Sequence, residues 1–269
     1  ATATGSGITG EEAAWEQWKL EPETELRFEV SPKETVLLKI SAGTAEIFGT
    51  GACAGETPMN QYLNTHLALE AIRRDALSFS TTSNQLSGPK VMIVGPQDVG
   101  KTSLAKILLS YSVKLGHPQI YADTDIGEAA SLSLPGTLAA SVFSRAVDVE
   151  EGMGGTLVSS GTAPVVFYYG YNEVNEKPKL YRKLMERLAE VVGVKLMNDA
   201  KVRAAGLIIN TPAAFSEPSG YELLSHAISV FKPTVLLVIG HERLYADLSR
   251  QHQSNRELTV LKLTKSGGV

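Results

Sequence analysis

The feature that most constrains this chain is the stretch from Val91 to Ser103, which reads VMIVGPQDVGKTS. Its four leading apolar residues predict a buried strand, and the run after Lys101 places apolar residues such as Leu104 and Leu108 on one side of a helix. The segment between them has the form G-x-x-x-x-G-K-T. A strand, such a loop and a helix in this order form the structural context of the phosphate-binding loop, which these flanks favour over an ordinary glycine turn.

The residue types of this loop fit the binding of nucleotide phosphates. Glycines let successive backbone N–H groups point inward and form a nest for phosphate oxygens, and the helix N-terminus adds unpaired donors and a favourable dipole. Lys101 can reach the outer phosphates, and the Thr102 hydroxyl is placed to ligate Mg²⁺. The expected nucleotide contacts of this stretch are Gly95, Gln97, Asp98, Val99, Gly100, Lys101, Thr102 and Ser103.

The composition excludes several broad classes of protein. Of the 269 residues, 43% are hydrophobic and 20% are charged, which is typical of a soluble globular chain. The net charge of −4 argues against a broad basic surface for nonspecific nucleic-acid binding and is compatible with a local basic groove. The single cysteine, Cys53, excludes an internal disulfide framework. No apolar run approaches the ~18 residues that span a bilayer and no signal peptide is recognisable, so we expect a cytosolic or nuclear protein without a membrane partner.

The amino-terminal part predicts a small β domain. Residues 1–14 are small and polar and are expected to form a flexible leader. Trp15 and Trp18 then open a domain over residues 15–56, in which we expect both rings to anchor the core. Short β runs at 26–30, 36–40 and 45–48 predict antiparallel strands, whereas residues 50–56 are too short and featureless to complete a sandwich, so this domain is expected to be incomplete.

A helix and a linker are predicted at residues 57–89. The helix should begin at Pro58 and end at Leu77, followed by a polar, Ser- and Thr-rich segment. Arg73 and Arg74 lie near its end, where solvated charges favour a helix C-terminus, and this is how we interpret them.

Residues 90–269 predict a phosphate-loop domain. Strand-like and helical runs alternate there, which indicates a parallel sheet with crossover helices. The expected fold is therefore α/β, with a central P-loop NTPase domain preceded by a small antiparallel β domain. After the phosphate loop, the predicted strands cover 120–122, 165–169, 207–209, 235–239 and 258–263, and the predicted helices cover 179–192, 221–231 and 243–251.

In such a sheet, ligands bind at the carboxyl ends of the strands, so the polar residues that follow each strand are candidates for a site. Asp123 and Asp125 follow the strand after the loop helix, and a carboxylate there can hold Mg²⁺ or accept a proton from a hydroxyl. A helix N-cap or a turn is the alternative role. The segments 210–211 and 240–242 are further places to inspect, and 265–268 (KSGG) can be a phosphate or base contact or a plain glycine loop.

Several segments in order along the chain resemble the polynucleotide 5′-hydroxyl kinase family, and within it the ATP-binding subunits of the eukaryotic pre-mRNA cleavage and polyadenylation factor. The similarity extends from Trp15 to Val269. The matching segments are 18–21 (WKLE), 23–28 (ETELRF), 45–50 (AEIFGT), 57–59 (TPM), 62–66 (YLNTH), 95–102 (GPQDVGKT), 134–137 (LPGT), 148–152 (DVEEG) and 265–268 (KSGG).

The resemblance implies a three-domain protein that holds ATP between its first two domains, with Glu25 contacting the nucleotide. From the residues themselves we expect Mg²⁺ to accompany this ATP, with Thr102 and Asp125 as metal ligands. The resemblance also implies a nuclear protein that binds a scaffold subunit of the cleavage factor and other 3′-end processing proteins, and RNA only weakly or indirectly. Two departures concern the domains. The family has a longer run of strands where this sequence has residues 51–55, and the C-terminal domain of the family and the arginine-bearing lid before it are expected to be absent.

A third departure concerns activity. Active members carry a Thr-x-Gly-Trp clasp that orients the RNA end, whereas the matching positions here are Thr211-Pro212-Ala213-Ala214, and fungal members that lack the clasp are similar to ATP binders without kinase activity. Loss of the stacking platform would cost ~1–3 kcal/mol per base.

Two functions therefore compete. In the favoured one, the protein is an interaction partner that holds ATP as a structural or regulatory ligand and is not an enzyme. In the alternative, it is a kinase that moves the γ-phosphate of ATP to an RNA 5′-hydroxyl, with Lys101, Asp123 and Asp125 as catalytic residues. A GTPase is disfavoured because no Asn-Lys-x-Asp motif follows a late strand.

Overall fold

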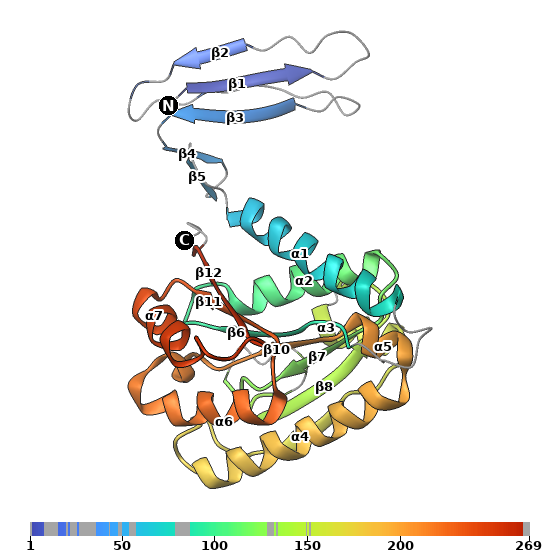
Figure 1. Ribbon diagram of the computed structural model, residues 1–269. Coiled ribbons are helices and arrows are strands. Elements are labelled where there is room, and N and C mark those ends of the chain that lie inside the picture. The colour runs from blue at the N-terminus through green and yellow to red at the C-terminus, as the bar shows by residue number, and fades with distance from the viewer. Residues whose placement is uncertain are drawn as a thin grey trace. The chain divides into compact units, whose positions relative to one another are not determined.

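The computed structural model describes residues 2–7, 16–19, 21, 26, 36–42, 44–47, 50–53, 58–78, 87–127, 132, 134–148, 150 and 152–265. The chain divides into two compact units, residues 1–60 with 266–269 and residues 61–265 (Figure 1). No helix within the described part of the chain combines the length and the apolar character that crossing a bilayer requires.

The first unit is built from antiparallel strands. Strands β1 (Thr2–Gly7), β2 (Glu16–Lys19) and β3 (Val36–Ala42) form one sheet in the order β2-β1-β3, and β4 (Thr44–Ile47) pairs with β5 (Thr50–Cys53). The small antiparallel β region that we expected is therefore confirmed.

Three details of this unit differ from the expectations. The prediction of a flexible leader is wrong for residues 2–7, because strand β1 is paired on both sides, with Thr2 opposite Lys19 and Ala3 opposite Ile40. We missed this strand because its residues, which are Thr, Ala, Gly and Ser, do not alternate between apolar and polar types. Backbone pairing forms without such alternation. Strand β5 occupies the segment that looked featureless. Trp18 is 43% exposed rather than a core anchor. Trp15 and residues 27–30 lie outside the described residues.

The second unit contains a seven-stranded sheet in the order β12-β11-β6-β10-β7-β8-β9. The strands are β6 (Lys90–Val94), β7 (Gln119–Asp123), β8 (Thr137–Phe143), β9 (Val165–Tyr168), β10 (Leu207–Asn210), β11 (Val235–Ile239) and β12 (Thr259–Leu263). All pairs from β12 to β7 are parallel, as predicted, whereas β8 pairs antiparallel with both β7 and β9. The α/β class is thus confirmed, and the structure adds the unpredicted strand β8.

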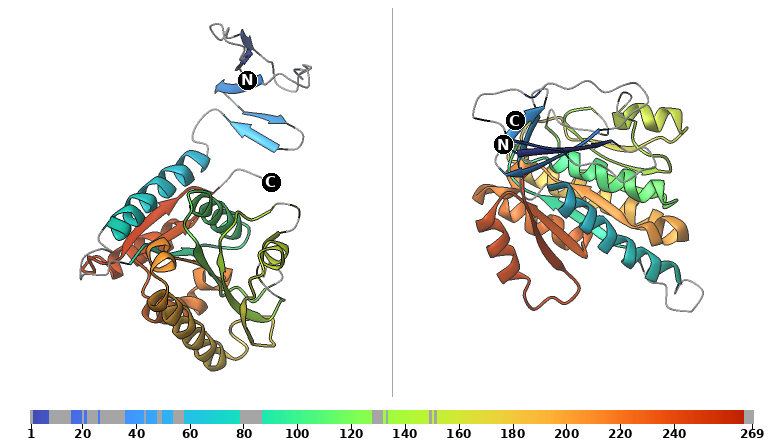
Figure 2. Two further views of the ribbon diagram at one scale, coloured as in Figure 1. Left: turned by 90° about the vertical axis from the view of Figure 1, so that its right-hand side faces the viewer. Right: turned by 90° about the horizontal axis from the view of Figure 1, so that it is seen from above.

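Helices cover both faces of this sheet (Figures 1 and 2). One core cluster joins the sheet to α1 (Pro58–Ser78), α2 (Lys101–Lys114) and α3 (Gly152–Ser159). A second cluster joins the opposite face to α4 (Pro178–Asn198), α5 (Ala200–Ala205), α6 (Tyr221–Phe231) and α7 (Glu242–Gln251). Strand β6 contributes Val91 and Ile93 to the first cluster and Met92 and Val94 to the second, as the alternation of side chains along a strand requires.

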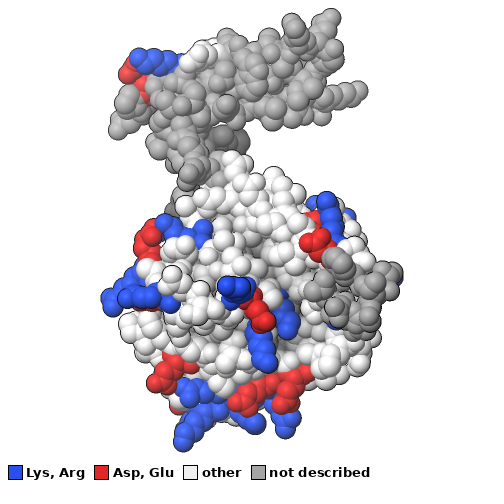
Figure 3. Space-filling model, viewed as in Figure 1, with Lys and Arg blue, Asp and Glu red and all other residues white. Residues whose placement is uncertain are grey.

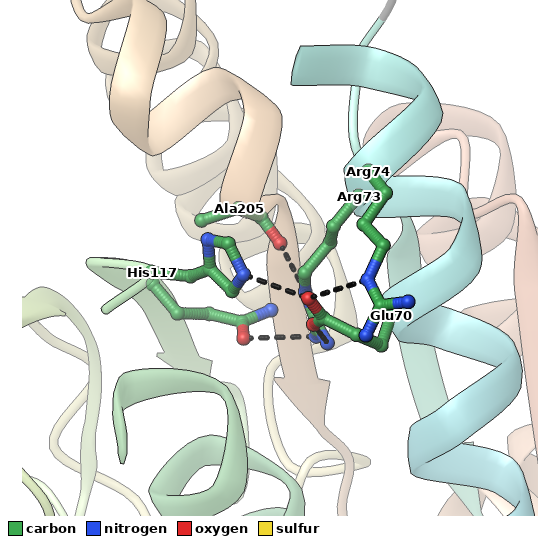
Figure 4. A network of polar contacts seen from close by, with 6 residues as sticks. Glu70, Arg73, Arg74, His117 and Ala205 are labelled. Atoms are coloured by element: carbon green, nitrogen blue, oxygen red, sulfur yellow. Dashed lines mark hydrogen bonds and ion pairs between the residues drawn. The ribbon is translucent and has the colours of Figure 1, made fainter. Parts of the chain in front are cut away.

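Helix α1 is attached to the sheet through a buried arginine (Figure 4). Arg73 is fully buried, and its guanidinium donates to the Ala205 carbonyl at 3.0 Å and to Gln119 Oε1 at 3.0 Å. Gln119 begins β7, and Ala205 ends α5 just before β10. The expectation that Arg73 is a solvated charge is therefore wrong, because its guanidinium is buried against acceptors at the amino ends of two sheet strands.

The carboxylate of Glu70 is the centre of the same network. It accepts from Arg73 Nη1 at 3.5 Å, and its other oxygen lies 2.9 Å from His117 Nε2 and 3.7 Å from Arg74 Nε. Arg74 is the exposed member of the group, with 73% of its side chain accessible, as we expected for it. Arg73, Glu70 and His117 thus form a polar cluster at the base of α1.

Candidate nucleotide-binding site

The loop between β6 and α2 has the curled backbone that a phosphate nest needs. Asp98 and Gly100 have φ values of 57° and 88°, in the left-handed region where a glycine is the least strained residue. Gly95 packs so closely on the end of β11 that a Cβ atom there would lie 2.7 Å from the Ile239 carbonyl oxygen. The sequence therefore needs a glycine at 95 for packing and at 100 for its backbone conformation.

Lys101 lies at the first turn of α2 and is 7% exposed. Its ammonium donates to the Pro96 carbonyl at 2.7 Å, so the side chain lies along the loop. Burial lowers the pKa of Lys101, and the carboxylates of Asp125 and Asp98 oppose this shift. The charge of Lys101 is thus only partly compensated by its neighbours, and a phosphate group would compensate it further.

A second set of polar side chains meets Thr102 from the ends of two neighbouring strands. Asn210, at the end of β10, is opposite Asp123, at the end of β7. The Asn210 amide donates to Asp123 Oδ1 at 3.1 Å and to Thr102 Oγ1 at 3.3 Å. Asn210 is fully buried, and its Oδ1 has no partner among the described residues. The structure thus brings Thr102 and Asp123 together through an asparagine that the sequence marked only as a place to inspect.

Asp125 lies beside this cluster. Its backbone N–H donates to Asp123 Oδ1 at 3.2 Å, and its Oδ1 accepts from the Gly127 N–H at 3.1 Å. Burial raises the pKa of Asp125, whereas the Gly127 N–H and the Lys101 ammonium oppose the shift. Burial thus disfavours the charged forms of both Lys101 and Asp125, and a bound anion and a bound cation would each favour those charged forms.

These residues fit a magnesium nucleotide better than a metal held by protein alone. No group of three or more His, Cys, Asp or Glu residues suited to a metal occurs in the part of the chain that the structure describes. Mg²⁺ is commonly bound by one or two carboxylates together with substrate phosphates and water. The hydroxyl of Thr102 and the carboxylate of Asp125 are donors of the right kind for such a shared site.

The segment after β11 lies against the phosphate loop but supplies different parts. Gly240 has a φ of 63°, and a Cβ atom there would lie 3.2 Å from Val99 Cγ1 and 3.4 Å from Lys265 Cβ. The neighbouring His241 caps α7, since its Nδ1 accepts from the Leu244 N–H at 3.0 Å. Of the glycine-rich 265–268 segment, Lys265 is therefore placed beside the loop, and residues 266–268 lie outside the described residues, as does Glu25.

The segment after β10 has a structural role in this chain. Thr211 is fully buried and its hydroxyl donates to the Ile93 carbonyl at 2.7 Å. Pro212 leads into a short 3₁₀ turn over Ala213–Ser216. The aromatic residue of that turn, Phe215, is fully buried and packs edge-on against Tyr181 with ring centroids 6.2 Å apart.

Family models match both parts of the chain. The model described as mRNA cleavage and polyadenylation factor CLP1 P-loop matches residues 95–269, and the N-terminal beta-sandwich domain of polyadenylation factor matches residues 19–52.

Similar curated proteins are longer than this chain. The mRNA cleavage and polyadenylation factor clp1 of Botryotinia fuckeliana is 37% identical over an alignment of 293 positions, which covers 93% of this chain and 62% of the relative. The polyribonucleotide 5′-hydroxyl-kinase Clp1 of Bos taurus is 38% identical over 287 residues, which cover 94% of this chain and 64% of the relative. The chain thus spans less than two thirds of the length of either protein.

A solved structure supports the fold. It describes an extended interface between Pcf11p and Clp1p and the structural basis for ATP loss in a glycine-to-arginine point mutant. Its match has a TM-score of 0.68 and 21% identity, and covers 100% of this chain and 64% of that chain. At this identity the likeness shows the fold alone, and the fold agrees with the one described above.

Proposed function

The chain belongs to the family described as mRNA cleavage and polyadenylation factor CLP1 P-loop, and we propose from this membership that it is an ATP-binding component of the pre-mRNA 3′-end cleavage and polyadenylation machinery. This membership confirms the family resemblance read from the sequence. The proposed role of ATP and Mg²⁺ is that of a structural or regulatory ligand. The observation that carries the proposal is the convergence of Thr102, Asn210 and Asp123 beside the curled phosphate loop.

In this proposal each part of the site has a separate task. The backbone N–H groups of Gly95 and of residues 97–102 surround the phosphates, and Lys101 contacts the outer ones. Thr102 and Asp125 would hold the metal, which would supply positive charge beside the phosphate oxygens. Asn210, whose amide also donates to Asp123, contacts Thr102 from the sheet side. Glu25 is proposed to contact the nucleotide, by resemblance to the family.

The proposed lack of kinase activity rests on the segment after β10. Where active relatives have an aromatic clasp, this chain has Pro212-Ala213-Ala214. The next residue, Phe215, is buried against Tyr181 and presents no face to a base. A missing stacking platform costs ~1–3 kcal/mol per base, and phosphoryl transfer depends chiefly on positioning.

The alternative function is that of a polynucleotide 5′-hydroxyl kinase. The Bos taurus relative carries the name of such a kinase. In such a reaction the RNA 5′-hydroxyl attacks the γ-phosphorus of ATP, ADP leaves, and Asp125 or Asp123 takes the hydroxyl proton. The raised pKa of Asp125 is compatible with a base of this kind, with burial as its main cause. Lys101 would stabilise the charge of the transferred group.

The partners follow from the same family membership. A scaffold subunit of the cleavage factor and other 3′-end processing proteins are the proposed partners, because the related Clp1p has an interface with Pcf11p. Such work takes place in the nucleus, which is the proposed location. On the face shown in Figure 3, basic and acidic side chains of the described residues lie intermixed rather than in one basic field. This distribution favours weak or indirect contact with RNA.

The test is a transfer assay with a 5′-hydroxyl RNA oligonucleotide and γ-labelled ATP. We expect the full protein to retain ATP and to transfer no label above background. Ala213→Gly together with Ala214→Trp should recover little activity, because a productive site also needs a supporting shell around the aromatic ring. Robust transfer by the unmodified protein that is lost in Lys101→Ala would refute the binder proposal and establish the kinase.

A further inference from the structure

The residue between the two candidate carboxylates is fixed on every side. Thr124 is 1% exposed and lies between Asp123 and Asp125. Its N–H and its hydroxyl both donate to the Asn210 carbonyl, at 3.1 and 2.7 Å. Its own carbonyl accepts from the Tyr181 hydroxyl at 2.6 Å. Because each polar group of Thr124 is bonded, neither adjoining peptide can rotate without losing a buried hydrogen bond.

Of the two partners of Thr124, Asn210 belongs to strand β10, and the other, Tyr181, comes from helix α4. It is fully buried on α4, and its ring packs edge-on against Tyr169 at 5.5 Å and against Phe215 at 6.2 Å. These neighbours come from the residue after β9 and from the turn after β10, and they pack the ring against the core. Burial is the main cause that raises the pKa of Tyr181 well above its ordinary value, so its hydroxyl stays protonated and remains a donor.

We propose that Tyr181 is a positioning residue for the metal site, acting through the Thr124 carbonyl to set the direction of the Asp125 carboxylate. The peptide that carries this carbonyl is the peptide that leads into Asp125, so the hydroxyl of Tyr181 fixes the plane from which the Asp125 side chain departs. Asp123 is held from the other side by the Asn210 amide. Groups behind the ligands are known to change metal affinity by about 10- to 100-fold. This inference rests on the proposed binding of Mg²⁺ with ATP.

The chain offers a matched pair of substitutions. Tyr181→Phe removes one hydroxyl and leaves the ring in place. Tyr169→Phe makes the same change in a ring of the same aromatic group that is 2% exposed, but its hydroxyl contacts the Glu173 and Val174 carbonyls and the Lys177 N–H instead of Thr124. Both variants lose a buried hydrogen bond, so both should unfold at a lower temperature than the parent. Only Tyr181→Phe should change the metal site.

The experiment measures ATP affinity by calorimetry, with saturating Mg²⁺ and with EDTA, after removal of bound nucleotide. In Tyr181→Phe we expect the affinity with Mg²⁺ to fall about tenfold and the affinity in EDTA to change less than about twofold. Tyr169→Phe should match the parent in both conditions. Equal losses with and without Mg²⁺ would mean general loosening, and no loss would mean that the hydroxyl does not act on the site. Either result overturns the positioning role.

ATP binding by the parent protein distinguishes failure of the positioning role from failure of the proposed function. If the parent binds ATP equally well with and without Mg²⁺, nucleotide binding stands and the positioning role is refuted. If the parent binds ATP in neither condition, the proposed function fails together with the inference.

Discussion

Arg73 offers the sharpest test of the interactions that hold α1 to the sheet. Replacing it by methionine keeps an unbranched stem as far as the position of Nε but removes the guanidinium from a site with no solvent exposure. The Ala205 carbonyl and the Gln119 side-chain oxygen each lose their 3.0 Å donor, and Glu70 loses a cation at 3.5 Å. Three buried acceptors are therefore left with fewer partners than before.

The structure sets the size of the effect. Removing one partner of a buried ion pair costs ~3–5 kcal/mol because the remaining charge stays buried. His117 still lies 2.9 Å from Glu70 and offsets part of this cost, so we expect the lower end, about 3 kcal/mol. For a domain of this size, about 3 kcal/mol lowers the melting temperature by about 6–12 °C.

Arg74 provides the matched control. It approaches the same Glu70 carboxylate at 3.7 Å, but 73% of its side chain is exposed. Exposed ion pairs contribute ~0–1 kcal/mol, so Arg74→Met should lower the melting temperature by no more than about 4 °C. The double variant Glu70→Met with Arg73→Met should be more stable than Arg73→Met alone, because no uncompensated carboxylate remains.

Calorimetry of the four proteins decides the matter. The reasoning is refuted if Arg73→Met and Arg74→Met melt at the same temperature, since burial would then add nothing to the interaction. It is also refuted if removing Glu70 from the Arg73→Met background lowers stability further, because the orphaned charge would then not be the source of the cost.

Two further predictions concern the phosphate loop and the response to pH. Lys101→Ala with Thr102→Ala should abolish nucleotide retention and the rise in melting temperature with added ATP, and unchanged ATP affinity would disprove the loop assignment. Burial is the main cause that lowers the pKa of His66 below its ordinary value near 6.5, so the unfolded chain gains a proton first as the pH falls. The unfolding free energy should therefore decrease below about pH 6.5, and denaturation at about pH 5 and about pH 8 should show a smaller decrease in His66→Leu; an unchanged decrease would contradict this.

The sequence predicted best those features whose cause is local. The phosphate loop depends on consecutive residues with fixed roles, and its strand and helix lie where the motif requires them. Strand β8 was missed because Leu138 to Phe143 contain two alanines and a serine that fit a helix as well as a strand. The antiparallel pairing of β8 also follows from the order of strands in the sheet, which no local pattern encodes.

The missed parts of the candidate site depend on residues far apart in the chain. Asn210 meets Asp123 and Thr102 across 87 and 108 positions. The rule that polar residues at strand ends share one edge of a parallel sheet pointed to Asn210, but only the observation that β10 lies between β6 and β7 makes it the link. Tyr181 gave no signal, since its spacing on α4 is that of an ordinary core residue. The charge of Arg73 suggested exposure to solvent for the same reason, because the two acceptors that attach it to the sheet are 46 and 132 positions away.

Helix α1 also changes what counts as a module in this protein. The phosphate-loop motif suggests a domain that begins at Lys90, yet Tyr62 and Leu69 of α1 belong to the core cluster on one face of the sheet. Burying side chains of this kind contributes roughly 1.5–3 kcal/mol each, a large share of the 5–15 kcal/mol that stabilises a typical domain. A gene fragment that begins at Lys90 would therefore encode the nucleotide loop in a domain that lacks these stabilising contacts. Recombination could shuffle this domain intact only with breakpoints upstream of α1.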